Sequence, residues 1–185
     1  SFYDGVKHIL IGLDHVLFVL LLFYSAPTFL RLLSLATAFT IGHSFSLVFG
    51  NNILISSPLF TPSIELLIAF SIMLSAVALL TNKTKLIGTT PLLIIGIIHG
   101  FGFSFVYKEL QNVGAETSLG ELFSFTAGIE AGQIIIYCIA FIITQIIQSK
   151  FPLIKPLKYQ VSLLAIIISI YWILTRATPI VQHFA

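Results

Sequence analysis

Residues 5–25 read GVKHILIGLDHVLFVLLLFYS, an apolar run that also holds two histidines and an aspartate. A helix needs about 20 mainly apolar residues to cross a bilayer, and this run is long enough. Ionisable side chains inside the hydrocarbon layer are costly and usually face the interior of a helix bundle. The stretch therefore predicts a membrane-spanning helix with a polar site, and His8, Asp14 and His15 are its first candidates.

The composition extends this prediction to the whole chain. Of the 185 residues, 57% are hydrophobic and only 9% are charged, whereas about a quarter of a soluble domain is charged. The net charge of +2 is small and scattered, so there is no basic patch for nucleic acid. We therefore expect a single integral-membrane domain at residues 1–185, with the lipid bilayer and no nucleic acid as partner.

Five further runs have the length and apolarity of a membrane span. Segments rich in proline, glycine and asparagine separate them. The predicted fold is all-α, a polytopic bundle of six transmembrane helices near residues 5–25, 29–49, 63–80, 89–107, 122–147 and 160–175. The sequence leaves the oligomeric state open, a homo-oligomer included.

The basic residues predict the orientation, because cytoplasmic loops of membrane proteins are enriched in lysine and arginine. With six spans, six of the nine basic residues fall on one side, and we expect that side in the cytoplasm. The larger group is Arg31, Lys83, Lys85, Lys150, Lys155 and Lys158, and the smaller is Lys7, Lys108 and Arg176. Both termini are then outside a bacterial-type inner membrane. An outside N-terminus fits the removal of a targeting segment.

Polar residues from four predicted helices are expected at a similar depth. Counted from the outer end at about 1.5 Å per residue, Asp14 and His15 lie roughly 14 Å in, His43 roughly 9 Å, and His99 and Glu130 roughly 12 Å. Unrelated polar residues have no reason to share a depth, so we predict one site in the outer half of the bilayer. Imidazoles with one or two carboxylates suit divalent nickel, zinc, cobalt or iron better than magnesium or calcium.

His8 lies seven residues before His15, on the same helix face but about 10 Å away along the axis. The two can ligate one ion only if the helix is broken, and Gly12 is the only candidate for a break. Otherwise His8 is expected in an outer vestibule with Glu65. Asp14 is expected either to ligate the metal or to fix the tautomer of a ligating histidine.

At these residues the sequence resembles the HupE/UreJ family of membrane proteins, the hydrogenase and urease accessory proteins. The similar segments are His8-x5-Asp14-His15, Gly42-His43-Ser44, Ile98-His99-Gly100 and Gly128-Ile-Glu130. The resemblance implies uptake of nickel, or a similar metal, across the inner membrane for metalloenzyme maturation. It also implies that His8, Asp14, His15 and His99 handle the metal. Nickel-transporting members have a second histidine four residues after the one matching His99, where this chain has Phe103.

Two functions fit these residues, and the sequence alone does not decide between transport and catalysis. The resemblance favours a metal permease. The nearly apolar inner halves of the spans favour an intramembrane hydrolase that acts on a lipid or lipoprotein from the outer leaflet. In that enzyme, a zinc-type ion on His15, His43 and His99 would activate water, Asp14 or Glu130 would be the general base, and Ser44 would stabilise an oxyanion. A haem carrier is disfavoured, because carboxylates share the depth of the histidines.

Overall fold

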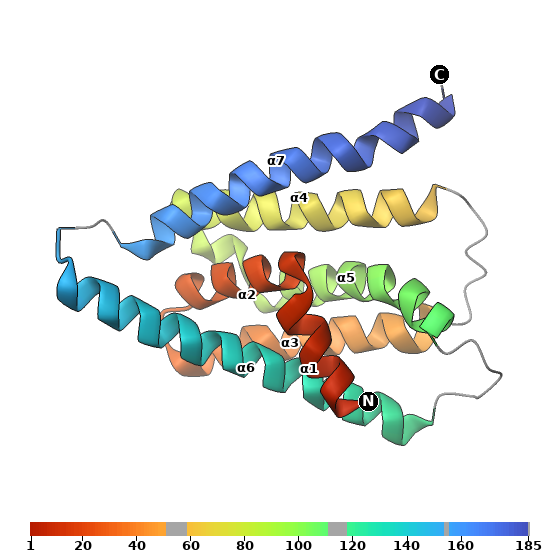
Figure 1. The fold of residues 1–185 in the computed structure, drawn as a ribbon, viewed down its shortest axis with the longest axis horizontal. Coiled ribbons are helices and arrows are strands. Elements are labelled where there is room, and N and C mark those ends of the chain that lie inside the picture. Colours follow the sequence, from red (N-terminus) through yellow and green to blue (C-terminus); the bar gives the residue numbers. More distant parts are fainter. Residues whose placement is uncertain (51–58, 111–117, 154–155, 185) are drawn as a thin grey trace.

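The computed structural model describes residues 1–50, 59–110, 118–153 and 156–184, with side chains left out at Gly50 and residues 104–110. This part of the chain is almost entirely α-helical and holds no strand, which confirms the predicted all-α class. The elements in chain order are α1 (Phe2–Ile11), α2 (Leu13–Ser25), α3 (Phe29–Gly50), α4 (Phe60–Leu80), the short 3₁₀-helix η1 (Thr84–Leu86), α5 (Thr89–Leu110), α6 (Leu119–Lys150) and α7 (Leu157–Phe184) (Figure 1).

The last five predicted spans each coincide with one helix, but the helices are longer than the predicted runs. α6 has 32 residues and α7 has 28, so they are about 48 and 42 Å long and exceed a hydrocarbon layer of about 30 Å. The start of α6 shows how polar residues extend a helix. Ser118 and Glu121 cap it reciprocally, each side chain bonding the other's backbone N–H. The predicted connections near residues 50–62 and 108–121 fall largely outside the described residues.

The prediction of one continuous helix over residues 5–25 is wrong. α1 and α2 meet at an angle of 81°, and Gly12 between them is extended, with φ −67° and ψ 103°. The Gly12 N–H still bonds the His8 carbonyl at 3.0 Å, and the Gly12 carbonyl accepts from Val16 N–H at 2.9 Å. Gly12 therefore stands at the end of α1 and at the start of α2, and it keeps one backbone hydrogen bond to each helix through the turn.

Four described helices are individually long and apolar enough to cross a membrane, and α1 with α2 makes a fifth span if the bent pair counts as one. α5 adds a shorter apolar stretch, Thr89–Phe103. Many large apolar side chains also point away from the bundle, among them Phe141, Leu163, Ile167 and Leu174. An apolar outer surface of this kind is what lipid requires. The chain is therefore a multi-pass membrane protein with four or five candidate spans.

Glycines allow the closest helix contacts. A Cβ atom at Gly42 on α3 would overlap the Leu93 carbonyl of α5, and one at Gly96 on α5 would overlap the Phe39 carbonyl of α3. Gly5 of α1 meets α6 at Gly128 in the same way. Small residues at such crossings let helix backbones pack directly in lipid. These contacts hold α1 and α3 in place, and both carry residues of the candidate site.

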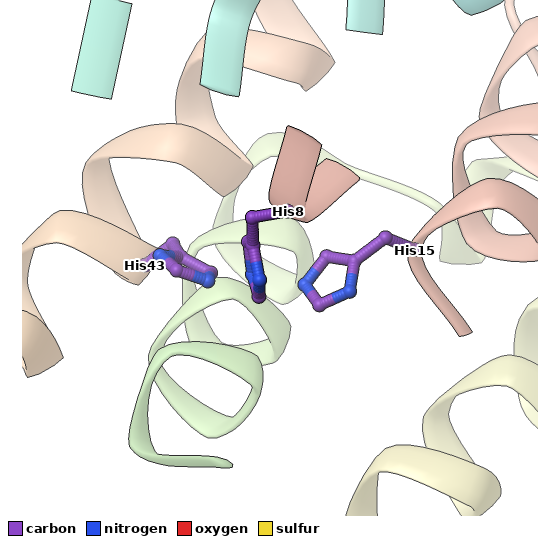
Figure 2. A group of neighbouring side chains, drawn as sticks. All are labelled: His8, His15 and His43. Carbon is purple, nitrogen blue, oxygen red and sulfur yellow. The ribbon is translucent and has the colours of Figure 1, made fainter. Parts of the chain in front are cut away.

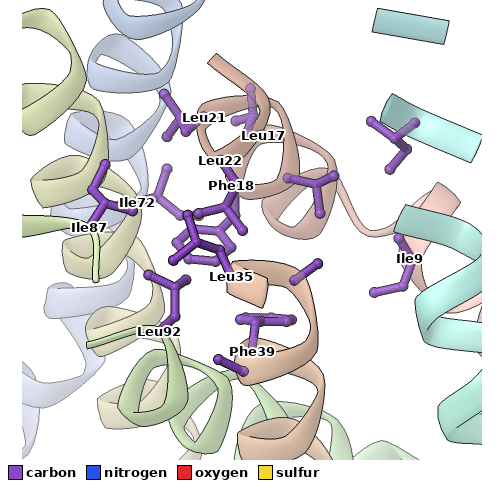
Figure 3. Packing of buried hydrophobic residues seen from close by; sticks show 14 of the residues in the cluster. Ile9, Leu17, Phe18, Leu21, Leu22, Leu35, Phe39, Ile72, Ile87 and Leu92 are labelled. Atoms are coloured by element: carbon purple, nitrogen blue, oxygen red, sulfur yellow. The ribbon is translucent and has the colours of Figure 1, made fainter. Parts of the chain in front are cut away.

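The apolar core surrounds α2, the short helix at the centre of the bundle (Figure 1). Phe18 and Leu22 of α2, Phe39 of α3, Ile72 of α4 and Leu92 of α5 are each at most 1% exposed, and they pack together in Figure 3. α2 is thereby fixed by three other helices. Its first turn, where Asp14 and His15 lie, begins beside this core.

Basic residues gather at one end of the bundle. Lys158 Nζ donates to Asn82 Oδ1 at 2.7 Å, joining the start of α7 to the end of α4. Arg31 donates to Thr89 at 3.2 Å, joining the starts of α3 and α5. At the opposite end Arg176 of α7 donates to the carbonyl of Glu65 in α4 at 3.0 Å, and its Nε lies 3.7 Å from the Glu65 carboxylate. Glu65 therefore contacts α7 and does not form the predicted vestibule with His8. Lys155 and the Lys108 side chain lie outside the described part of the chain.

Candidate metal centre

Three imidazoles from three helices meet beside the Gly12 bend. His8 is in the last turn of α1, His15 in the first turn of α2 and His43 in α3. Each offers one nitrogen, and these three nitrogens lie within 4.8 Å of one another. Figure 2 shows His8 between the other two rings, with centroids 4.5 Å from His15 and 5.5 Å from His43. In an unbroken helix His8 and His15 would be about 10 Å apart, so the bend creates the group.

The nitrogens in this group have unmet hydrogen-bonding capacity. His43 is 0% exposed and His15 4%. Nε2 of His8, Nε2 of His15 and both ring nitrogens of His43 are buried without a partner in the described part of the chain. Leaving a buried polar atom unpaired costs about 1–3 kcal/mol. A cation bound by several of these nitrogens at once would satisfy their unpaired lone pairs.

Asp14 orients His15. Its Oδ1 lies 3.0 Å from His15 Nδ1 and also accepts from the His15 backbone N–H at 2.9 Å. A carboxylate can only accept when ionised, so His15 carries its proton on Nδ1 and presents the Nε2 lone pair to the group. A carboxylate behind a histidine in this way is the usual support of a metal-ligating imidazole.

The three imidazole nitrogens are slightly too far apart to bind one metal ion together and would have to move closer. Around a tetrahedral ion with metal–nitrogen bonds of about 2.0–2.1 Å, ligating nitrogens are about 3.3 Å apart. The three nitrogens lie within 4.8 Å of one another, so the approach that an ion requires is at most about 1.5 Å.

His99 adjoins the group without belonging to the set of three nitrogens. Its ring centroid is 5.2 Å from that of His15, and it is 1% exposed. Its Nε2 is 3.1 Å from Ser71 Oγ, and that hydroxyl donates its proton to the Ile68 carbonyl at 2.7 Å. Ser71 can then only accept, so Nε2 of His99 carries the proton. The other nitrogen, Nδ1, keeps a buried lone pair without a partner.

Glu130 and Ser44 lie apart from the histidine nitrogens. Glu130 Oε1 accepts from the Thr37 hydroxyl at 2.7 Å, and Ser44 bonds Thr126 at 2.9 Å. Thr37 precedes His43 by six residues, about 9 Å along α3, so Glu130 is not level with His43 as the depth count predicted. That count assumed that α6 begins at residue 122 and runs straight across, whereas it begins at Leu119 and is 32 residues long.

Of two residues beside the group, Ser71 carried no signal in the sequence, and Phe103 carried one only through the family resemblance. Ser71 is one of several serines in an apolar helix, and only its contact with His99 sets it apart. Phe103 packs on His8, with ring centroids 3.9 Å apart, and closes one side of the group. The bend itself had a signal, because Gly12 is the one glycine between His8 and His15.

The fold and the site together define a class, a multi-pass α-helical membrane protein with a buried group of histidines beside a broken helix. The chain belongs to the HupE/UreJ protein family, because the sequence model of that family matches residues 1–176. The resemblance found in the sequence is therefore confirmed. No curated protein matches the chain, and no solved structure matches it.

Proposed function

We propose that this protein is an inner-membrane permease for a divalent transition metal of the nickel or cobalt type. The observation that carries the proposal is the group of three imidazoles, two of them buried and that of His8 half-buried, whose nitrogens lie within 4.8 Å of one another. Neutral imidazole suits nickel, cobalt, zinc and iron(II), and magnesium and calcium prefer oxygen. The family supports handling of such a metal.

In this proposal His8, His15 and His43 bind the ion and Asp14 orients His15. His99, whose ring centroid lies 5.2 Å from that of His15 and whose Nδ1 has no partner in the described part of the chain, takes part as the ion enters or leaves. An ion moves through a protein only if it is bound strongly enough to enter and weakly enough to leave. The three nitrogens must move closer together to bind an ion, and His99 offers a fourth nitrogen near them. Such an arrangement suits temporary binding of a transported ion.

The broken helix supports the same function. Transporters commonly place their substrate sites where a membrane helix is interrupted, because the interruption frees polar groups inside the bilayer. The α1–α2 bend at Gly12 is such an interruption, and the histidines flank it. We propose six crossings with both termini outside, since most basic residues lie at the end of the bundle that carries Arg31 and Lys158. The metal site is then in the outer half of the bilayer.

A metal-dependent hydrolase is the second candidate, because three histidines with an open fourth position also suit a zinc ion that activates water. It is less well supported than the permease. The predicted oxyanion donor Ser44 is bonded to Thr126, and the predicted base Glu130 is bonded to Thr37. Asp14 faces His15 and lies behind the group of nitrogens.

Metal uptake into proteoliposomes tests the permease directly. The purified protein is reconstituted into vesicles that enclose a metal-sensitive dye, and nickel, cobalt or magnesium is added outside. We expect nickel and cobalt to enter and magnesium to stay out. His43→Ala should abolish entry, whereas His183→Ala, a change at an exposed histidine near the end of α7, should leave it unchanged. A tightly held metal ion without any uptake would favour the hydrolase.

A further inference from the structure

Polar side chains recur along one face of α6. Thr126, Glu130, Gln133, Tyr137 and Thr144 follow one another at intervals of four, three, four and seven residues, which is the spacing of one helix face. This face covers about 27 Å of helix and is directed at α3 and α2. The histidine group lies outside it, so the face is a separate feature of the bundle.

Side chains of the neighbouring helices meet this face in pairs. Ser44 and Thr126 are hydrogen-bonded at 2.9 Å, and Gln133 Nε2 donates to Thr40 Oγ1 at 3.1 Å. Thr37 Oγ1 donates to Glu130 Oε1 at 2.7 Å. Further along, Tyr24 of α2 bonds Thr144 at 2.8 Å. The contacts of α6 with α2 and α3 are therefore more polar than the apolar runs of the sequence indicate, because these groups come from three different helices.

The middle of this face has oxygen atoms whose bonding capacity is unmet. Gln133 is 1% exposed and Tyr137 3%, and neither Gln133 Oε1 nor the Tyr137 hydroxyl has a partner in the described part of the chain. Glu130 lies between Thr126 and Gln133 along this face of α6, and it accepts one hydrogen bond from Thr37. No described basic side chain lies within ion-pair distance of its carboxylate. An ionised carboxylate in hydrocarbon requires a compensating charge.

We propose that Glu130, Thr37 and Gln133, with Tyr137 beside them, form a second cation site that takes a monovalent ion of the Na⁺ kind. All the donors are oxygen atoms, which suit hard cations and not the transition metals that imidazole selects. The single carboxylate is neutralised by one positive charge, and a divalent ion would leave a net charge in the membrane. A proton on Glu130 would neutralise the carboxylate but supplies only one O–H donor, whereas a cation can contact several oxygen atoms at once.

Cation binding at this second site does not depend on whether the protein is a metal permease. A role of the bound cation in transport, however, rests on the proposed function. In a permease, a second cation bound between α3 and α6 can couple metal movement to an ion gradient. α3 carries both His43 and Thr37, so the same helix contacts both sites. We expect metal uptake to increase when Na⁺ is present outside the vesicles.

Equilibrium binding of ²²Na⁺ to the purified protein tests the site. We expect one saturable equivalent in the wild type, and binding weaker by about tenfold or more in Glu130→Gln and in Thr37→Val, because each loses a contact to the ion. Both changes keep the side-chain volume nearly constant. Thr144→Val is the matched control, since it removes a bonded hydroxyl from the same face of α6 two turns beyond Tyr137, and it should bind as the wild type does.

Nickel titration of the same samples separates this proposal from the previous one. Glu130→Gln and Thr37→Val should bind nickel as the wild type does, and His43→Ala should lose nickel but keep ²²Na⁺. Absence of ²²Na⁺ binding in the wild type overturns the proposal, and so does unchanged binding in Glu130→Gln. If that variant does not fold, unchanged binding in Thr37→Val overturns it equally. Displacement of ²²Na⁺ by equimolar Mg²⁺ would contradict the assignment to a monovalent ion.

Discussion

Replacing Gly12 by alanine changes the one position where α1 and α2 meet beside the metal ligands. A Cβ atom there would lie 2.9 Å from His15 Nδ1 and 3.0 Å from Asp14 Oδ1. The Asp14–His15 pair must therefore shift by a few tenths of an ångström, and His15 loses its orientation. Disturbing the partner of a ligating histidine typically lowers metal affinity about 10–100-fold.

A second effect acts in the same direction. Alanine is about 1 kcal/mol more favourable than glycine inside a helix, so Gly12→Ala also favours a continuous helix over the bend. In a continuous helix, His8 and His15 would be about 10 Å apart along the axis and could not share an ion. We therefore expect the nickel dissociation constant to rise by at least the 10–100-fold of the steric effect, about 1.4–2.7 kcal/mol.

Isothermal titration of the purified protein with nickel measures this change. Gly88→Ala is the control, because a Cβ there would meet only Pro91 Cδ at 3.6 Å and the Lys85 carbonyl at 3.9 Å, which is ordinary contact. Thermal unfolding in detergent shows that both variants are folded. An affinity of Gly12→Ala within about twofold of the wild type would refute the claim that the bend positions the ligands.

Three further predictions follow from the same geometry. Asp14→Asn should weaken nickel binding about tenfold and should have no further effect in a His15→Ala background, which a double-mutant cycle by titration calorimetry measures. Nickel affinity should fall as the pH falls, because protons compete for the imidazole nitrogens, and calorimetry in buffers of different ionisation enthalpy should show proton release on binding. Gly42→Ala should destabilise the protein by about 1–3 kcal/mol, seen as a lower melting temperature, because its Cβ would overlap the Leu93 carbonyl; an unchanged melting temperature would contradict that contact.

The membrane class and most helices could be predicted from the sequence, because length and apolarity are local properties. The run at residues 29–49 is an example: it is continuously apolar, and the structure has the single helix Phe29–Gly50 there. The family could also be predicted, since the motif His8-x5-Asp14-His15 lies within one short segment. The number of crossings could not, because it depends on whether α1 and α2 form one span.

The arrangement of the site was harder to predict, because it depends on angles between helices. The sequence indicated Gly12 as the only place for a break, but not that the break is there or that it is 81°. The depth count placed Glu130 with the histidines, whereas the structure pairs it with Thr37. Depth along a straight span says nothing about which face a residue presents, or how a long helix such as α6 starts and tilts.

The most direct test of the metal centre compares single histidine variants in one nickel-binding experiment. The account predicts that His8→Ala, His15→Ala and His43→Ala each abolish stoichiometric binding, that His99→Ala reduces affinity by less, and that His183→Ala binds like the wild type. His8 is the decisive variant, because only the bend at Gly12 brings it to the other two rings. Stoichiometric nickel binding by folded His8→Ala, with wild-type affinity, would contradict the account.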